Sequence, residues 1–195
     1  LSMTDWIDAR EADYDNSLDL ELVTIALSKL HRASKGFKPS REANPRNLWG
    51  KWIKILNNRC KEIYEFKDIA KSKKIKSSFD KKYIEFADYF YDMGKKSIKH
   101  LKKNHYSSVS KKNKNKSTFC HNDLGSANVL LTANNDCFFI DFDNCILDMT
   151  IHDLAGFILK NIRCRPLDMD KVYFILNTYH KKNPISEEEI KIMKA

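Results

Sequence analysis

Residues His121–Asn128 (HNDLGSAN) and Asp141–Asp143 (DFD) combine side-chain types at a spacing that suits phosphoryl transfer. Asp123 can accept a proton from a hydroxyl group, and Asn128 and Asp141, thirteen residues apart, can share a magnesium ion. Magnesium prefers hard oxygen ligands and keeps some of its waters, so one carboxylate and one amide beside the phosphates of a nucleotide form a suitable set. The two segments therefore predict a site for a magnesium-bound triphosphate.

Folding of a β-hairpin is expected to bring these residues together. Short apolar runs on either side of Ala133–Asn135 predict the hairpin, and Thr118–His121 predicts a further short strand before the loop that holds Asp123. Because Asn128 opens the first hairpin strand and Asp141 closes the second, both lie at one edge once the hairpin forms. The alternative is that these residues serve only turns and caps, where Asp and Asn are common.

Helical periodicity dominates the rest of the chain. In the second and third predicted helices, aromatic and aliphatic residues follow one face from Leu48 to Phe66 and from Phe79 to Leu101, and we expect both faces to be buried core. The expected fold class is therefore mainly α (α+β). Helices are expected over residues 17–34, 48–66, 79–101, 152–162 and 168–182, and from 186 onward.

The composition is that of a folded, globular chain. Of the 195 residues, 42% are hydrophobic and 11% aromatic, which excludes global disorder. The mean hydropathy of -0.56, without a long apolar run, excludes a membrane-spanning segment. The first residues include two acids and only a short apolar stretch, so they do not form a secretory signal peptide.

The cysteine pattern predicts free thiols in a reducing, cytoplasmic environment, because five cysteines occur without a C-x-x-C pair. A zinc site built from Cys120, Cys137, Cys145 and His152 is an alternative, although their spacing fits no paired zinc motif. Buried cysteine that acts as a small hydrophobic residue is far more common. His31 is likewise expected to be a structural histidine with satisfied hydrogen bonds rather than a metal ligand.

The net charge of +9 comes from one segment. Residues 95–116 hold nine lysines and no acid, and the remainder of the chain is balanced. Within that segment, Ser107–Ser117 shows no apolar period and predicts a solvated loop; the alternative is electrostatic capture of an acidic partner. Nucleic-acid binding is disfavoured, because no base-reading motif accompanies the charge.

The motifs resemble those of the aminoglycoside phosphotransferase and choline kinase superfamily, whose fold is similar to that of protein kinases. Within it, the chain looks most like the CotS-type spore coat proteins. The similarity spans almost the whole chain, and the two catalytic motifs contribute most of it. The segments that carry the resemblance are Thr4–Glu11, Leu30–Ser34, Phe119–Asn128, Ile140–Cys145 and Asp153–Ala155.

The resemblance implies roles for the residues of the catalytic loop. Asp123 is expected to be the catalytic base, and His121 and Asp153 are expected to brace its loop through hydrogen bonds. A direct catalytic role for His121 is less favoured than bracing or plain packing, because the base position is already filled.

The resemblance also implies ATP and Mg²⁺ as cofactors of the full-length protein. Asn128 and Asp141 are the expected ligands of the nucleotide-bound metal, and Asp143 is expected to assist them. One position departs from the family, which usually has glycine where this chain has Asn122. A side chain there is expected to narrow the loop or to alter how the substrate approaches.

Other parts of a kinase are missing from the sequence. No glycine-rich phosphate loop precedes the catalytic motif, and no strand offers the lysine and partner glutamate that hold the α- and β-phosphates. Residues 1–16 resemble the hinge between kinase lobes, and residues 17–195 then form a kinase-like C-lobe with a small β-hairpin at its catalytic loop. We expect the N-lobe to lie outside this sequence and the C-terminus to be truncated.

Two functions follow as hypotheses. The first is ATP- and magnesium-dependent phosphoryl transfer to a small-molecule hydroxyl substrate, which would enter between the aromatic helices and the catalytic loop. The second is a catalytically inactive structural or interaction protein of the spore coat, with spore-coat proteins as partners and the lysine segment 95–116 as its docking surface. The expected location is the cytoplasm, or the spore coat for the second function. Neither a membrane nor a nucleic acid is expected as a partner.

Overall fold

The computed structural model describes residues 5–162 and 168–195 of the chain. The fold is mainly α with small β-sheets, as the sequence predicts. The chain divides into two compact units. We call Leu1–Asn47 with Asn113–Ser186 the sheet unit, and Leu48–Lys112 with Glu187–Ala195 the hairpin unit.

Short strands in the sheet unit confirm the predicted β-hairpin. Its two strands pair antiparallel, with Val129 opposite Phe139. The predicted strand at Thr118–His121 is wrong, because this segment contributes one isolated bridge, from Cys120 to Ile146. The three-stranded sheet has the order β1-β3-β4 and consists of β1 (Arg10–Glu11), β3 (Val129–Leu131) and β4 (Cys137–Phe139), while β2 (Arg46–Asn47) and β5 (Ile146–Leu147) form a parallel pair.

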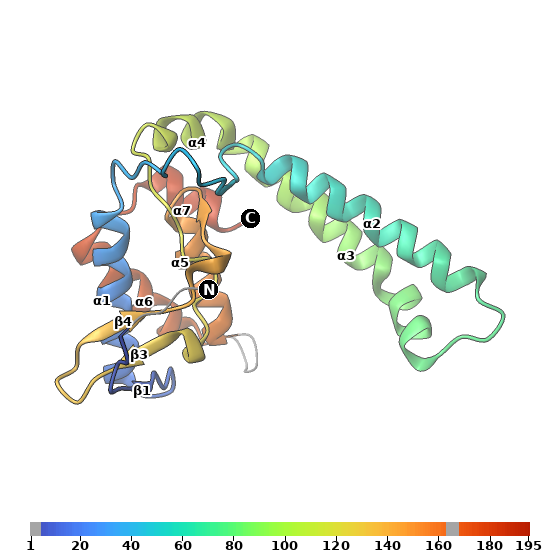
Figure 1. Ribbon diagram of the computed structural model, residues 1–195. Coiled ribbons are helices and arrows are strands. Elements are labelled where there is room, and N and C mark those ends of the chain that lie inside the picture. Colours follow the sequence, from blue (N-terminus) through green and yellow to red (C-terminus); the bar gives the residue numbers. More distant parts are fainter. Residues whose placement is uncertain (1–4, 163–167) are drawn as a thin grey trace. The chain divides into compact units, whose positions relative to one another are not determined.

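Three helices complete the sheet unit at close to their predicted bounds: α1 (Ser17–Ala33), α5 (Ile151–Ile162) and α6 (Met169–Lys182). The first begins after Asn16, whose side chain accepts the backbone N–H groups of Leu18 and Asp19 and so satisfies two donors that lack helical partners. Helix α6 packs against both α1 and α5 (Figure 1). The fully buried side chains Val23, Leu27, Leu154, Phe157 and Ile175 come from all three helices and form one apolar core.

Two long helices form the hairpin unit, α2 (Trp52–Ser72) and α3 (Ser78–Lys103), which lie side by side (Figure 1). A capping box between Ser77 and Asp80 starts α3. The helices approach closely at Gly94, where an added Cβ would lie 2.6 Å from the Sγ of Cys60. The shorter helices α4 (Tyr106–Lys114) and α7 (Glu187–Met193) also belong to this unit, except for the last two residues of α4, which belong to the sheet unit.

The expectation that the aromatic faces of α2 and α3 are buried core is wrong for most of their large side chains. Phe66, Phe79, Phe86 and Phe90 are all exposed. The residues buried between the two helices are mainly small, such as Cys60, Ala70 and Ala87, with Gly94 at the closest approach. A two-helix hairpin buries only the strip between its helices, so an apolar face wider than that strip stays outside. The exposed aromatic side chains of the two helices are Tyr64, Phe66, Phe79, Phe86, Tyr89 and Phe90.

The solvated loop predicted at Ser107–Ser117 is also wrong. Most of this segment is helix α4, in which Tyr106, Val109 and Ser110 are buried at helical spacing. The hydroxyl of Tyr106 accepts the backbone N–H of Trp52, and the two rings stack. The lysines occupy the remaining, exposed positions, which is why the composition alone indicated a loop. No helix among the described residues is both long and apolar enough to cross a lipid bilayer.

Candidate functional site

A single buried carboxylate holds the loop that carries Asp123. Asp153, in the first turn of α5, is 2% exposed. Its Oδ2 accepts the backbone N–H of His121 at 2.6 Å, and its Oδ1 accepts that of Asn122 at 2.7 Å. A buried carboxylate is tolerated only when it is fully hydrogen-bonded. Two successive amides on its two oxygens therefore fix the backbone immediately before Asp123.

The backbone of Asn122 has a conformation that glycine adopts more readily than other residues. Its φ of +66° lies in the left-handed region, which glycine adopts freely and asparagine tolerates better than other residues with a Cβ. The side chain turns toward the segment after β4, where its Nδ2 donates to the carbonyl oxygen of Asn144 at 3.2 Å. The loop thus keeps the backbone geometry that glycine would give and gains a cross-link to that segment.

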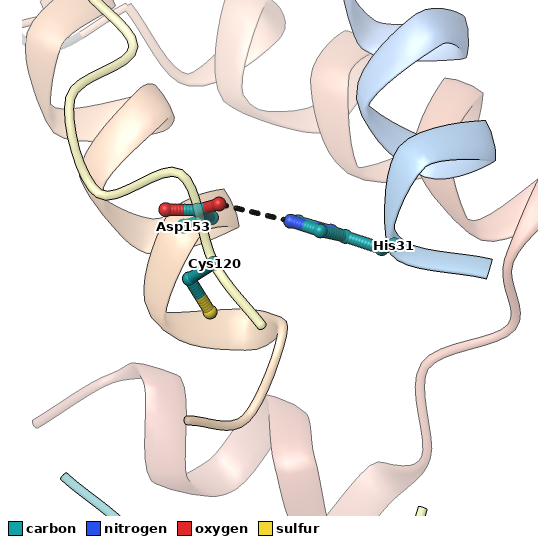
Figure 2. A group of neighbouring side chains, drawn as sticks. All are labelled: His31, Cys120 and Asp153. Atoms are coloured by element: carbon teal, nitrogen blue, oxygen red, sulfur yellow. Dashed lines mark hydrogen bonds and ion pairs between the residues drawn. The ribbon is translucent and has the colours of Figure 1, made fainter. Parts of the chain in front are cut away.

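A buried chain of polar groups lies behind Asp153. The Nε2 of His31 donates to Asp153 Oδ2 at 3.0 Å (Figure 2). The Nδ1 of the same ring lies 2.7 Å from the hydroxyl of Tyr179. Because Asn183 Nδ2 donates to that hydroxyl oxygen at 2.8 Å, the Tyr179 proton is free to bond to His31 Nδ1. His31 is fully buried and both its ring nitrogens are bonded, as expected for a structural histidine.

The chemistry of this cluster argues against a metal. His31, Cys120 and Asp153 have ligand atoms within 4.8 Å of one another, but both Asp153 oxygens already accept hydrogen bonds. The Cys120 thiol donates to the carbonyl oxygen of Met149 at 3.3 Å, and burial raises its pKa well above the ordinary value, which opposes the thiolate that metal binding needs. In Figure 2 the thiol lies beside the histidine–aspartate pair without an interaction drawn to either.

The hypothetical zinc set does not assemble among the described residues. The cluster of potential ligands found there does not include Cys137, Cys145 or His152, and the ring of His152 pairs with Asp148 at 2.8 Å. The four cysteines that the structure describes, Cys60, Cys120, Cys137 and Cys145, are free thiols.

His121 links the catalytic loop to the end of β4. Its Nδ1 accepts the backbone N–H of Asp123 at 3.3 Å, and its Nε2 donates to the carbonyl oxygen of Ile140 at 2.8 Å. A ring nitrogen that accepts carries no proton, so this geometry corresponds to the tautomer with its proton on Nε2. Because both nitrogens bind backbone groups, the geometry gives His121 a bracing contact between Asp123 and the residue that precedes Asp141.

Asp123 is half-exposed and forms an ion pair with Lys160 of α5. Lys160 Nζ lies 2.6 Å from Asp123 Oδ1, and Asn144 Nδ2 lies 3.5 Å from Oδ2. The hydrogen bond and charge of Lys160 hold the pKa of Asp123 below its ordinary value, against a smaller effect of burial. The carboxylate is therefore ionised and reachable from solvent, as a proton acceptor must be.

Two of the predicted metal ligands, Asn128 and Asp141, lie at the open end of the hairpin, next to its last backbone hydrogen bond. The backbone N–H of Ile140 donates to the carbonyl oxygen of Asn128 at 3.1 Å, so Asn128 lies beside the residue before Asp141. The Nδ2 of Asn128 donates to the carbonyl oxygen of Asp123 at 3.0 Å, which leaves its Oδ1 available as an acceptor. Asp141 and Asp143 are exposed. One amide oxygen and two solvent-accessible carboxylates are hard donors that fit Mg²⁺.

Two contacts of the catalytic loop were missed by sequence reasoning. Lys160 lies seven residues after Asp153, about two turns along one helix, so its position on the same face as the brace was a usable signal. Tyr14 donates its hydroxyl to the carbonyl oxygen of Leu124 at 3.1 Å and packs its ring against Phe157. No local sequence pattern predicts this contact of Tyr14, because 110 residues separate Tyr14 from Leu124.

Solved structures with the same fold are phosphotransferases. The chain superimposes on an aminoglycoside phosphotransferase from Alicyclobacillus acidocaldarius with a TM-score of 0.79 and 15% identity. The match covers 97% of this chain and 55% of the Alicyclobacillus chain. The AMP-bound spectinomycin phosphotransferase APH(9)-Ia gives a TM-score of 0.56 and 18% identity over 95% of this chain and 56% of that one. The chain thus spans about half the length of these relatives. They confirm the kinase-like phosphotransferase fold.

The sequence match is broader than the two motifs. The profile of choline/ethanolamine kinase matches residues 3–177, which includes the catalytic loop, the hairpin and the helix that carries Asp153 and Lys160. Because this match covers most of the chain, the chain belongs to the choline/ethanolamine kinase family.

Proposed function

We propose that the chain is the C-lobe of an ATP- and magnesium-dependent phosphotransferase that acts on a hydroxyl group of a small molecule. The observation that carries this proposal is the placement of Asp123. It is ionised, open to solvent and held by a loop whose backbone is fixed through Asp153 and His121. Phosphoryl transfer depends on positioning and electrostatics, and this loop supplies both. Residues outside this sequence would supply the N-lobe, and residues 1–16 would form the hinge.

Each residue of the site has a definable task in this reaction. Asp123 accepts the proton of the acceptor hydroxyl, and Lys160 keeps that carboxylate ionised between turnovers. Asn128 Oδ1, Asp141 and Asp143 would hold the metal. Magnesium, when bound, neutralises charge on the triphosphate. The ring of His121 keeps the base and the predicted metal-binding segment in register, since it bonds to the backbone of both.

The relatives support a small-molecule acceptor without naming it. One solved relative is a spectinomycin phosphotransferase, and the family is that of choline and ethanolamine kinases. Acceptor choice within one fold depends on the shape and charge of the pocket, so it does not transfer with the fold. The proposal is therefore limited to phosphoryl transfer to a hydroxyl group.

A second candidate function is that of a catalytically inactive interaction protein of the spore coat. The resemblance to CotS-type proteins supports it, and so does the ion pair at Asp123, where Lys160 engages one oxygen of the base at 2.6 Å. The cytoplasm is the expected location for the enzyme, and the spore coat for this alternative.

Calorimetric titration of Mg-ATP into the full-length protein separates the two. The wild type is expected to bind, and Asp141→Ala is expected to weaken binding by about tenfold or more, about 1.4 kcal/mol. Asp123→Asn is expected to keep nucleotide binding but to lose phosphoryl transfer. Asp136→Ala, at an exposed acid in the hairpin turn, serves as the matched control. Binding that is absent, or unaffected by Asp141→Ala, would exclude the enzyme and favour the spore-coat function.

A further inference from the structure

The turn that joins α2 to α3 carries a dense positive charge. Residues 71–82, which we call the hairpin tip, contain six lysines and one acid, and they comprise the last turn of α2, the connection and the start of α3 (Figure 1). The lysines of the tip are Lys71, Lys73, Lys74, Lys76, Lys81 and Lys82.

Local contacts use only part of this charge. Lys73 Nζ lies 2.6 Å from Asp80 Oδ1, and Asp80 also accepts from the backbone and hydroxyl of Ser77. These contacts lower the pKa of Asp80 to about 2, and Lys73 has the largest effect. The single acid of the tip is therefore ionised and paired with Lys73. Lys82 reaches Glu85 at 3.2 Å in an exposed pair that solvent screens. Most of the lysine charge of the tip therefore faces solvent.

Two large apolar side chains stand among these lysines. Ile75, within the connection, is 90% exposed, and Phe79, in the first turn of α3, is 71% exposed. Neither supports the fold at these exposures. Two large apolar side chains this exposed, four residues apart in one lysine-rich turn, point to a surface that is buried by a partner.

The apolar character continues from the tip along α3. The ring of Phe79 lies 6.0 Å from that of Tyr83, which borders an open groove of about 390 Å³. Lys82 lies at the edge of this groove, with its Nζ 5.5 Å from the centre of the Phe86 ring. The groove is lined by Ile63, Lys82, Tyr83, Phe86, Ala87 and Phe90. An apolar strip bordered by Lys82 is thus continuous with the tip.

We propose that the hairpin tip docks on an anionic phospholipid surface. Ile75 and Phe79 would enter the boundary between headgroups and acyl chains, and the surrounding lysines would pair with lipid phosphates and carboxylates while their methylene stems cover apolar surface. The negative surface potential of an anionic leaflet attracts clustered lysines, and exposed apolar side chains among them add a hydrophobic contribution.

This combination distinguishes a lipid surface from other polyanions. A nucleic acid or an acidic protein would match the lysines, but binding to phosphates leaves an aliphatic side chain such as Ile75 without a role. The expectation that no membrane partner exists rested on the lack of a spanning segment. Docking on a surface requires none.

Co-sedimentation of the purified chain with phospholipid vesicles tests the proposal. We expect binding to vesicles of phosphatidylcholine with about one third phosphatidylserine, no binding to pure phosphatidylcholine, and loss of binding in high salt. The triple variant Lys71→Gln, Lys74→Gln, Lys81→Gln and the double variant Ile75→Ser, Phe79→Ser should each weaken binding by about tenfold or more. All five positions are exposed, so circular dichroism should show an unchanged fold.

Two controls match these variants. Lys95→Gln, Lys96→Gln, Lys99→Gln removes the same charge elsewhere on α3, and Tyr173→Ser removes an exposed aromatic ring from α6; both should bind like the wild type. If the two triple variants lost vesicle binding equally, binding would depend only on the net charge of the protein, and the proposal would be overturned. Binding that survives the Ile75, Phe79 double variant and is competed fully by heparin would also overturn it, in favour of a polyanion site.

Discussion

The sheet unit and the hairpin unit differ in net charge and in which kinds of side chain they bury and expose. The sheet unit has 15 basic and 16 acidic residues, whereas the hairpin unit has 20 and 10, so the hairpin unit accounts for the whole excess positive charge. The sheet unit buries polar groups, among them His31, His121 and Asp153, and the hairpin unit exposes aromatic ones such as Phe79 and Phe90.

This contrast indicates where each unit can tolerate change. In the sheet unit, polar groups are buried because they position the loop of Asp123, so losing one leaves its partners unpaired in a medium of low polarity. In the hairpin unit, small residues set the contact between α2 and α3 and the large side chains lie outside. Substitutions should therefore be severe at buried polar positions of the first unit, and severe in the second only where the helices touch.

Asp153→Ala is the most severe change that this comparison predicts. It leaves the N–H groups of His121 and Asn122 and the ring of His31 without their acceptor in a buried site. We expect the free energy of unfolding to fall by about 3–5 kcal/mol, measured by urea denaturation. Hydrogen exchange should show loss of protection at the catalytic loop.

The matched control is Asp92→Ala, at an exposed acid of α3, which should change stability by less than about 0.5 kcal/mol. If Asp153→Ala cost no more than this control, the carboxylate would not be the brace of the loop. Asp153→Asn should fall between the two, because an amide oxygen can still accept from one backbone N–H.

Gly94→Ala tests the tightest contact of the hairpin unit. The added methyl group would lie 2.6 Å from the Sγ of Cys60, which is only 2% exposed, so the two groups would clash unless a neighbour shifts. Overpacking should cost about 1–3 kcal/mol, partly offset by the higher helix propensity of alanine, worth up to about 1 kcal/mol. Thermal unfolding of the variant checks this.

The double variant Cys60→Ala, Gly94→Ala provides the internal control, since it returns the space that the new methyl group needs. It should be more stable than Gly94→Ala alone. Two single effects that simply add would show that the helices do not touch at this point.

Asn122→Ala is a smaller test in the sheet unit. An alanine forced to keep a φ near +66° is strained, and it also loses the hydrogen bond to Asn144, so we expect a cost of about 1 kcal/mol. Asn122→Gly should be neutral within about 0.5 kcal/mol, because glycine adopts this conformation freely. A result in which both variants behaved alike would locate the effect in the side-chain hydrogen bond rather than in the backbone.

Features with local causes were predictable from the sequence. These features depend on neighbours along the chain: the cap of α1 at Asn16, the β3–β4 hairpin, and the spacing in sequence of Asp123, Asn128 and Asp141 around that hairpin. Helix α4 was missed because its buried face is formed by only a few residues, such as Tyr106 and Val109, among lysines and serines.

Contacts between helices, strands and loops that are far apart in the sequence were not predictable. Periodicity identified the apolar faces of α2 and α3, but it does not specify what covers them, and here much of their large apolar surface stays open. At the candidate site, the motifs predicted a base and metal ligands, whereas the support from Tyr14 and the pairing with Lys160 come from tertiary contacts. The brace from Asp153 was anticipated only through the family resemblance.

Lys160→Met gives the smallest effect on stability and is the most direct test of the candidate base. Both partners of the ion pair are more than one third exposed, so its loss should leave the unfolding midpoint nearly unchanged. Because Lys160 lowers the pKa of Asp123, its removal should raise that pKa, and carbon-detected NMR titration of the Asp123 carboxyl would measure the shift. Because the pKa of Asp123 is lower in the folded state than in the unfolded state, its ionised carboxylate stabilises the fold fully at pH values above the unfolded-state pKa. This stabilisation fades as the pH falls through the folded-state pKa, so the variant should lose this weak sensitivity to acid.

The rate of the full-length protein gives a second test of the base. In the full-length protein the acid limb of the rate profile should move to higher pH along with the titration of Asp123. An unchanged Asp123 pKa in Lys160→Met would remove Lys160 from the site, and a shifted pKa without a shifted rate profile would remove Asp123 as the base.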